Sequence, residues 1–244
     1  MTDKSDRVFK GYNKKNTSSC MMRIDKREII LSVLCGQARL YRPGLDVAEK
    51  LYEKSKRKKQ NRDWQIKNLT VMEIFEPIWR RDYYDWKVKM INKTGWLYNF
   101  SEQAEGEMLL AQWYDARKLR IYYRWLHKSG RFTLERVLKY MYSPLFPAIL
   151  IMERGYLHPD RERLIIEFNF NHDPGVEMLS RWFWDILEIR TSVYRDEEWF
   201  SYLFIDDDEM KKTLELLMPV IGKIPSMHER FYQREASRLY QPLR

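Results

Sequence analysis

The 244-residue sequence has few of the residues that build metal centres and disulfide frameworks. Cys20 and Cys35 are its two cysteines, and its four histidines are scattered, so that no Cys-x-x-Cys motif and no His/Cys cluster occurs. Structural zinc is therefore not expected, and neither is a framework of disulfides. The scarcity of cysteine favours a reducing, intracellular compartment over secretion.

Long apolar runs are also missing. No run approaches the roughly 18 residues that identify a membrane-spanning helix. The N-terminal segment lacks the apolar core of a signal peptide, and Asp3 and Asp6 argue against an organellar transit peptide. We therefore expect no membrane partner and no cleaved leader.

The charge is uneven along an otherwise globular composition, in which 44% of the residues are apolar and 15% are aromatic. The net charge is +9, yet residues 1–62 hold 17 Lys and Arg against 7 Asp and Glu, while the rest hold 27 against 28. The excess is densest in EKSKRKKQNR (53–62). Such a block is either a solvated loop or a polyanion contact, and the release of counterions favours nucleic acid as the polyanion.

Hydrophobic periodicity and helix-boundary residues predict an order that occurs twice: helix, two strands, helix, two strands, helix. In the first half we expect helices over 25–37, 77–91 and 117–130, and strands over 38–42, 63–68, 95–100 and 109–115. In the second half we expect helices over 144–155, 174–189 and 206–222, the last ending before Pro219, and strands over 163–171 and 199–205. The repetition indicates an internal duplication.

One predicted helix has a clear apolar stripe. Over 77–91, the side chains of Trp79, Tyr83, Trp86 and Met90 recur at steps of three and four residues. We expect these four side chains to face the core.

The segments YYRWLHKSGRFTLERVLKYMYSPLFPAILIMERGYL (122–157), VEMLSRWFWDILEIRTSVYR (176–195) and WFSYLFIDDDEMKKTLELLMPVIGKIPSMHERF (199–231) resemble the second half of a known family. The family is that of the LAGLIDADG homing endonucleases and maturases, in their two-motif, single-chain form. REIILSVLCGQARLYR (27–42) looks like the first motif, and 43–62 and 69–80 look like insertions.

The resemblance implies an α+β fold: a pseudo-twofold duplication of an αββαββα unit, in which two antiparallel sheets flank two central packed helices. It also implies a monomer with internal pseudo-symmetry. We expect a basic N-terminal arm (1–22), a first repeat (23–130) that contains the basic insertion 43–62, and a second repeat (131–244).

In that family each motif helix ends in an acid directly before Gly or Ala, and the two acids share divalent cations over the scissile phosphates. Here Gln37 precedes Ala38 and Arg154 precedes Gly155. Glutamine offers only a weak carbonyl ligand, and arginine stays charged and repels Mg²⁺. Glu153 lies one residue early, about 100° round the helix, and is interpreted as a capping or ion-paired acid. We therefore expect no catalytic residue, no metal and no cofactor.

The family's sheets lie along the nucleic acid. Strand alternation puts Phe200, Tyr202 and Phe204 on that face of the second half. Residues 151–208 carry 6 basic against 14 acidic residues, a balance that repels phosphates. The aromatic side chains are interpreted as a protein-docking surface. Stacking of unpaired RNA bases, or a register shifted by one residue that buries the aromatics, remain alternatives.

The first half keeps basic and amide side chains. The candidate nucleic-acid contacts are Lys10, Lys14, Lys15, Arg39, Arg42, Lys54, Lys56, Arg57, Lys58, Lys59, Arg62, Gln65 and Lys67, with Gln65 and Lys67 expected to alternate on a strand. A clamp on a duplex needs both halves. RNA bound mainly through its phosphates is therefore favoured over duplex DNA.

The sequence thus predicts a catalytically inactive, nucleic-acid-binding member of the LAGLIDADG type. We expect an RNA-binding structural component of a ribonucleoprotein, for which an organellar ribosome is one setting, or a maturase-like splicing factor. A homing endonuclease with an atypical metal site and a domesticated duplex-DNA-binding regulator remain alternatives. The resemblance favours an organelle matrix, such as that of the mitochondrion, alongside the cytoplasm.

Overall fold

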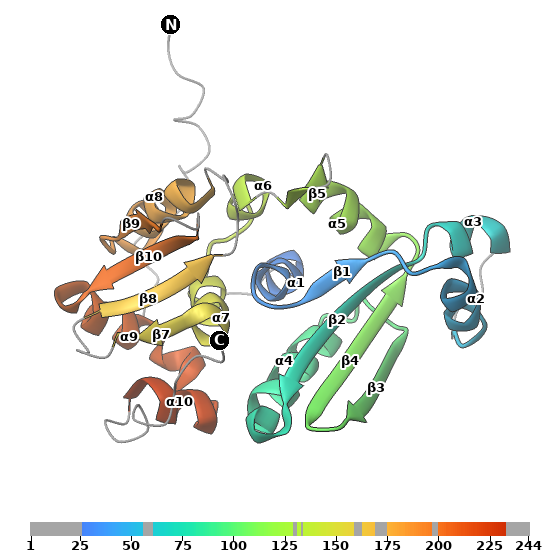
Figure 1. Ribbon diagram of the computed structural model, residues 1–244, viewed down its shortest axis with the longest axis horizontal. Helices are drawn as coiled ribbons and strands as arrows, with labels where there is room; N and C mark the ends of the chain where they lie inside the picture. The colour runs from blue at the N-terminus through green and yellow to red at the C-terminus, as the bar shows by residue number, and fades with distance from the viewer. Residues whose placement is uncertain are drawn as a thin grey trace, which may run out of the picture.

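The computed structural model contains the expected duplication (Figure 1). The residues that it describes are 26–55, 61–128, 131–132, 134–158, 163–168, 175–196 and 200–232. Two four-stranded antiparallel sheets lie on either side of two central helices. The order helix, two strands, helix, two strands, helix occurs twice, which confirms the predicted α+β fold class.

The first half builds its sheet in the order β1-β2-β4-β3. Its elements are α1 (Lys26–Cys35), β1 (Arg39–Tyr41), α2 (Leu45–Glu53), α3 (Arg62–Lys67), β2 (Thr70–Pro77), the 3-10 turn η3 (Ile78–Arg80), α4 (Arg81–Lys93), β3 (Phe100–Glu105), β4 (Met108–Asp115) and α5 (Lys118–Leu126). Helices α4 and α5 pack against β2 and β4.

The second half repeats this plan with the sheet order β7-β8-β10-β9. It is reached through β5 (His127–Lys128), β6 (Arg131–Phe132) and α6 (Leu134–Leu138). Its elements are α7 (Leu145–Arg154), β7 (Gly155–Leu157), β8 (Arg163–Phe168), α8 (Gly175–Leu187), β9 (Ser192–Arg195), β10 (Ser201–Asp206), α9 (Asp207–Ile221) and α10 (Pro225–Tyr232). Helix α10 returns to the first half, where Asp82 of α4 accepts hydrogen bonds from the N–H (2.8 Å) and the hydroxyl (2.6 Å) of Ser226.

The central helices α1 and α7 pack side by side and are largely enclosed (Figure 1). Every residue of α7 from Leu145 to Glu153 is buried. Small side chains on both helices, Ser32 and Ala148, are fully buried and let the backbones approach. Because each buried aliphatic side chain contributes about 1.5–3 kcal/mol, this pair anchors the fold. It also brings the C-terminal ends of the two helices together.

Two element predictions in the first half are wrong. Residues 63–68, expected as a strand, lie in helix α3 and just past its end, and the side chain of Asn61 caps that helix by accepting a hydrogen bond from the Trp64 N–H (3.1 Å). The true strand, β2, lies within the stretch 69–80 that was expected to be an insertion. Gln65 and Lys67 are therefore on a helix and do not alternate along a sheet.

The stripe predicted for the helix over 77–91 is correct at Tyr83, which is buried, and at Trp86 and Met90, which are partly buried against the core, but it is wrong at Trp79. Helix α4 begins at Arg81, and its buried residues are Tyr83, Tyr84, Lys87 and Ile91. Trp79 instead lies in η3 and is 58% exposed. Lys87 is also among the buried residues of α4. Nearby carboxylates balance its charge, as described below.

Three smaller differences concern one additional strand and the ends of two other elements. Strand β9 was not expected, β3 begins only at the last residue of the predicted 95–100 strand, and α9 continues through Pro219 to Ile221. Pro219 is exposed in the last turn, where its missing N–H removes a single helical hydrogen bond. None of the helices in the described ranges is both long enough and apolar enough to cross a membrane. The division into repeats at residue 130 stays a prediction.

Candidate functional site

Positions 37 and 154 lie at the adjoining ends of the central helices, and each side chain binds the opposite helix. The Gln37 side-chain amide donates to the carbonyl oxygen of Glu153 (3.0 Å). The Arg154 guanidinium donates to the carbonyl oxygens of Cys35 (3.2 Å) and Gly36 (2.6 Å). These carbonyls belong to the end of α1, where backbone acceptors have no partner within the helix. Arg154 therefore acts as a C-terminal cap supplied by the other half of the molecule.

Glu153 is a buried bridge between the two halves. Its side chain is 1% exposed, and its Oε2 accepts a hydrogen bond from the backbone N–H of Gln37. Its Oε1 accepts from the Tyr83 hydroxyl (3.0 Å) and from the Lys87 ammonium (2.8 Å). The carboxylate fits because Gly36 has no side chain, and a Cβ at Gly36 would overlap it. Both oxygens of the carboxylate are thus engaged inside the protein.

Lys87 connects Glu153 to a second buried acid. Its ammonium lies 2.5 Å from Oε1 of Glu76, at the end of β2, and both side chains are 1% exposed. Arg80 lies 3.7 Å from the other oxygen of Glu76. Two cations and two carboxylates therefore balance one another, which is the condition under which charges remain buried.

The electrostatics of this ion cluster keep Lys87 charged. Burial by itself lowers the pKa of Lys87, but the carboxylates of Glu153 and Glu76 outweigh burial and raise it above 10.5. Burial raises the pKa of Glu76 above 4.5, against the opposing charge of Lys87. Burial and the charge of Glu153 raise the pKa of Tyr83, so its hydroxyl remains a hydrogen-bond donor. Sequence analysis did not identify Lys87, Tyr83 and Glu76 as site residues. Lys87 follows Tyr84 by three residues on the same helix face, and a lysine on a buried face is a signal that could have indicated a buried ion pair.

These helix ends do not fit a divalent cation. Mg²⁺ requires a near-octahedral set of oxygen ligands that includes carboxylates. Arg154 brings a positive charge, Gln37 offers one neutral amide oxygen, and Glu153 has no oxygen left over. Among the described residues, no group of three or more His, Cys, Asp or Glu is arranged to hold a metal ion. The side chains at the family's metal positions instead fasten one central helix to the other.

The first sheet turns a polar face away from the core. Glu73 on β2 accepts hydrogen bonds from the Tyr41 hydroxyl (2.5 Å) and from the Gln112 amide (2.5 Å). Arg39, a candidate contact, lies over the ring of Phe75 at 5.1 Å from its centroid. Arg39 and Glu73 are cross-strand partners, so the cation has an acid for a neighbour.

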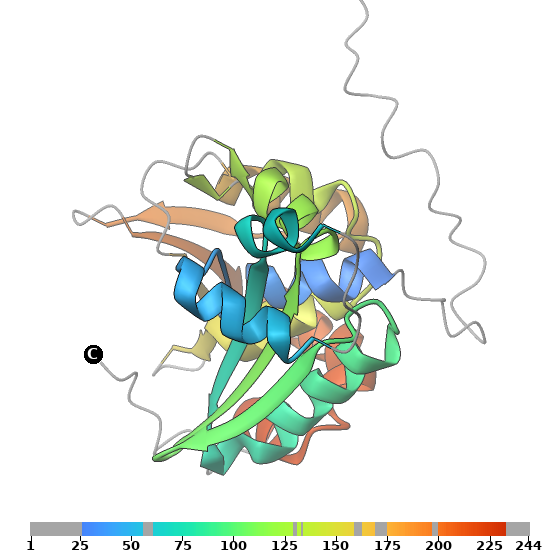
Figure 2. The same cartoon turned by 90° about the vertical axis from the view of Figure 1, so that its right-hand side faces the viewer.

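The insertion that contains α2 and α3 covers one end of this same face (Figure 2). Tyr52 of α2 and Ile66 of α3 form a small apolar cluster with Val71 and Tyr114 of the sheet, separate from the main core. Val71 and Tyr114 are cross-strand partners of each other, and Val71 also pairs with Tyr41. The covered surface is therefore one end of the polar face of the first sheet.

The second sheet presents aromatic side chains on the corresponding face. Leu203 and Ile205 are fully buried in the core, whereas Tyr202 and Phe204 are half-buried on the opposite side. Their rings gather with Tyr194 of β9 at centroid distances of 5.9–6.4 Å. A register shifted by one residue therefore does not occur.

This aromatic face is short of free positive charge. Arg163, at its edge, pairs with Asp206 at 3.4 Å. Glu167 is the cross-strand partner of Tyr202, whose hydroxyl donates to Asp196 (2.9 Å). Phe200 precedes β10 and is half-buried.

The remaining candidate contacts are dispersed. Arg42 lies over the ring of Tyr123 at 5.0 Å, and Arg62 is 3.9 Å from Glu53. Gln65 is buried in α3, whereas Lys54 and Lys67 are exposed. Lys10, Lys14, Lys15, Lys56, Arg57, Lys58 and Lys59 lie outside the described residues.

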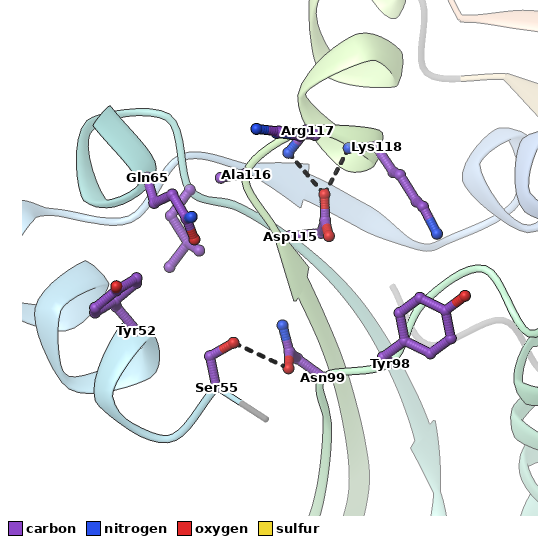
Figure 3. Close-up of a pocket in the computed structure, with 10 residues that line it drawn as sticks. Tyr52, Ser55, Gln65, Tyr98, Asn99, Asp115, Ala116, Arg117 and Lys118 are labelled. Atoms are coloured by element: carbon purple, nitrogen blue, oxygen red, sulfur yellow. Dashed lines mark hydrogen bonds between the residues drawn. The ribbon is translucent and has the colours of Figure 1, made fainter. Parts of the chain in front are cut away.

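A cavity of about 200 Å³ separates the insertion from the first sheet (Figure 3). Asp115 accepts hydrogen bonds from the N–H groups of Arg117 (2.6 Å) and Lys118 (2.5 Å), which fixes the start of α5. Ser55 donates to the side chain of Asn99 (3.2 Å). These hydrogen bonds join residues of the lining to one another, and they hold the start of α5 and the end of α2 in place.

The architecture matches solved structures, although no protein-family model and no curated protein matches the sequence. The homing endonuclease I-WcaI, bound to its DNA recognition sequence, is 13% identical with a TM-score of 0.56, over 85% of this chain and 87% of that one. A variant of the homing endonuclease I-DmoI, in complex with its nicked target DNA, is 15% identical with a TM-score of 0.50, over 79% and 94%. The chain has the LAGLIDADG homing endonuclease fold.

The resemblance read from the motifs is thereby confirmed for the fold. In this LAGLIDADG fold α1 and α7 are the two central motif helices, and the two sheet faces lie to either side of them. The helix ends, at 37 and 154, carry the substitutions described above.

Proposed function

We propose that this protein uses the LAGLIDADG fold to bind nucleic acid and does not cleave it. The observation that carries the proposal is the buried bridge of Glu153. The nearest acid to the family's metal positions accepts hydrogen bonds on both oxygens and faces a lysine instead of solvent. Arg154 adds a fixed cation at the place of the second acid. Metal-assisted hydrolysis needs ligands that these groups do not supply.

A nicking assay tests the proposal. Supercoiled plasmid is incubated with the purified protein and Mg²⁺ or Mn²⁺, with EDTA as the blank and Glu153→Gln as the matched variant. We expect no nicking by either protein. Metal-dependent nicking that Glu153→Gln abolishes would contradict the proposal and support an endonuclease with an atypical metal site.

We propose RNA, and not duplex DNA, as the nucleic acid that is bound. A clamp on duplex DNA uses both sheet faces, but the insertion covers one end of the first, and the aromatic face of the second has its edge arginine paired with an acid. Clustered cations of the first half suit a flexible phosphate chain.

Competition between a single-stranded RNA and a duplex DNA of the same sequence measures this preference. We expect the RNA to compete better. Selection from random duplex DNA separates the remaining alternative, because a duplex-binding regulator would yield a sequence motif.

The biological role that follows is structural. We propose an RNA-binding component of a ribonucleoprotein, with a mitochondrial ribosome as one setting, or a maturase-like splicing factor, working as a monomer. Crosslinking in cells distinguishes the two roles, since ribosomal RNA or intron RNA would be recovered. Fractionation of the same cells distinguishes an organelle matrix from the cytoplasm.

The aromatic face of the second sheet is proposed as a protein-docking surface. Tyr194, Tyr202 and Phe204 combine apolar area with hydroxyl groups, a composition that is enriched in interface cores. The acidic surroundings disfavour RNA there. Base stacking on these rings is the competing interpretation, and it is tested below.

A further inference from the structure

A basic and aromatic hollow of about 480 Å³ lies between α3 and α5 of the first half. The two helices are neighbours in Figure 2. It is lined by Asn61, Trp64, Arg117, Arg120, Ile121 and Arg124. None of these residues is acidic. The hollow lies on the outer helices, away from the central helix ends and from the aromatic face of the second sheet.

The three arginines form one row on α5. Positions 117, 120 and 124 are three and four residues apart, so they share a helix face and span about 10 Å of its axis. The guanidinium groups of Arg117 and Arg120 lie 6.0 and 5.3 Å from the centroid of the Trp64 ring.

Among the residues that the structure describes, the row has no ion-pair partner. Within the described ranges, no ion pair joins any of the three arginines to an Asp or Glu. The Nε atom of Arg120 is buried and has no hydrogen-bond partner. Three neighbouring cations that form no ion pair repel one another, and an external anion reduces that repulsion.

Two features argue that the fold does not require this row. Arg117 and Lys118 lie at the N-terminus of α5, where the helix dipole disfavours positive charge. Helix α9, which follows β10 as α5 follows β4, begins with Asp207, Asp208 and Glu209, the charges that the dipole favours. The same structural position thus carries opposite charge in the two halves.

The basic and aromatic surface continues on the other side of Ile121. A second hollow of about 410 Å³ is lined there by Arg27, Trp96, Lys118, Tyr122, Trp125 and Tyr140, together with Ile121. Ile121 itself is 65% exposed, so an apolar side chain projects between two basic margins.

We propose that the hollow between α3 and α5 binds the backbone of single-stranded RNA, an inference that rests on the proposed RNA-binding function. Guanidinium forks bind phosphate oxygens bidentately. The three guanidinium groups of the row can each contact one phosphate of the strand. Unpaired bases stack on aromatic rings and on guanidinium planes, which Trp64 and its two arginines provide.

The test compares two triple variants of equal charge. Arg117→Gln, Arg120→Gln and Arg124→Gln are combined in the first. The control combines Arg181→Gln, Lys211→Gln and Lys223→Gln, three exposed basic residues of the second half. The affinity of each full-length protein for a fluorescein-labelled single-stranded RNA of mixed sequence is measured by anisotropy at several salt concentrations.

We expect the α5 variant to bind at least about tenfold more weakly, and its salt slope to fall by about 2, since each lost phosphate contact removes about 0.7. The control should stay within about twofold of the wild type. If thermal melting shows that the triple variant is unfolded, the exposed pair Arg117→Gln and Arg124→Gln replaces it, with a slope change of about 1.4.

The outcomes separate this inference from the proposed function. RNA binding that is unchanged in affinity and slope by the α5 variant overturns the site and leaves RNA binding standing. An equal loss in the control reduces the effect to net charge and also overturns the site. A wild-type protein that binds no RNA overturns both. Weakening that is confined to a duplex DNA probe assigns the hollow to duplex DNA.

Discussion

Lys87 is a fully buried cation on α4 that contacts two carboxylates, Glu76 and Glu153. Lys87→Met leaves Glu153 buried without its cation and leaves Glu76 with Arg80 alone, and breaking a buried ion pair typically lowers the free energy of unfolding by about 3–5 kcal/mol. Lys89→Met, an exposed position on the same helix, should change it by about 0.5 kcal/mol or less. Urea denaturation of both variants measures the difference. Similar small effects at the two positions would mean that Lys87 is not enclosed.

The same cluster predicts an alkaline limit of stability. The pKa of Lys87 is raised above 10.5 in the folded protein, so between 10.5 and the raised value the folded state holds a proton that the unfolded state has lost. The free energy of unfolding therefore falls as pH rises through this window. Tyr83 contributes with the same sign above pH 10. The wild type should lose stability more steeply above pH 10.5 than Lys87→Met, and parallel curves would contradict the assignment.

At the residue scale, the sequence identified part of the site because that part is local. Gln37, Glu153 and Arg154 stand beside the glycine and alanine that end the motif helices. Lys87 and Glu76 reach Glu153 from α4 and β2, far away in the chain. No sequence spacing encodes that meeting, which depends on how α4 packs against the central pair.

At the scale of elements, the insertion of α2 and α3 behaves as an added unit with its own apolar cluster. Tyr52→Ala removes a side chain that is 7% exposed from that cluster but from no part of the main core. We expect faster hydrogen exchange in α2 and α3 and unchanged protection in α1 and α7, because units with separate cores open separately. Mass spectrometry of peptides from both regions measures this. A uniform loss of protection would make the insertion part of the core.

Element types were predicted correctly where the apolar pattern runs over many residues, and they were missed where it runs over only a few. Helices α7 and α8 follow clear patterns, whereas α3 has six residues whose Trp64 and Ile66 also fit strand alternation. The cap at Asn61 favours the helix over the strand. It requires a left-handed backbone at Asn61 (φ 71°), which was not predicted from the sequence. Strand β2 lacks alternation because the insertion covers Val71 at one end of its outer face and because Glu76 is buried on its core side beside Lys87.

For the whole molecule, the two halves divide the charge and are proposed to divide the binding. Replacing Tyr194, Tyr202 and Phe204 together by serine should leave the affinity for single-stranded RNA within about twofold, whereas base stacking on the rings would make the loss about tenfold or more. Anisotropy with the RNA used for the α5 variants makes the comparison direct. A large loss would move RNA onto the second sheet and remove the case for protein docking there.

The duplicated architecture could be predicted because each repeat encodes its own periodicities. The hollow between α3 and α5 could not, because one wall is a helix that was predicted as a strand and the other is a helix for which only the bounds were predicted. The spacing of Arg117, Arg120 and Arg124 was visible, but Trp64 joins them only in the folded chain.

The contacts around Gly36 oppose single substitutions at the ends of α1 and α7. Exchanging Arg154 for an aspartate would strip the cap from α1 and set a second negative charge beside Glu153. Adding an acid at Gln37 would do the same from the other side. We expect either single substitution to lower the free energy of unfolding without creating a complete set of metal ligands. A metal site at these helix ends would therefore require several substitutions at once.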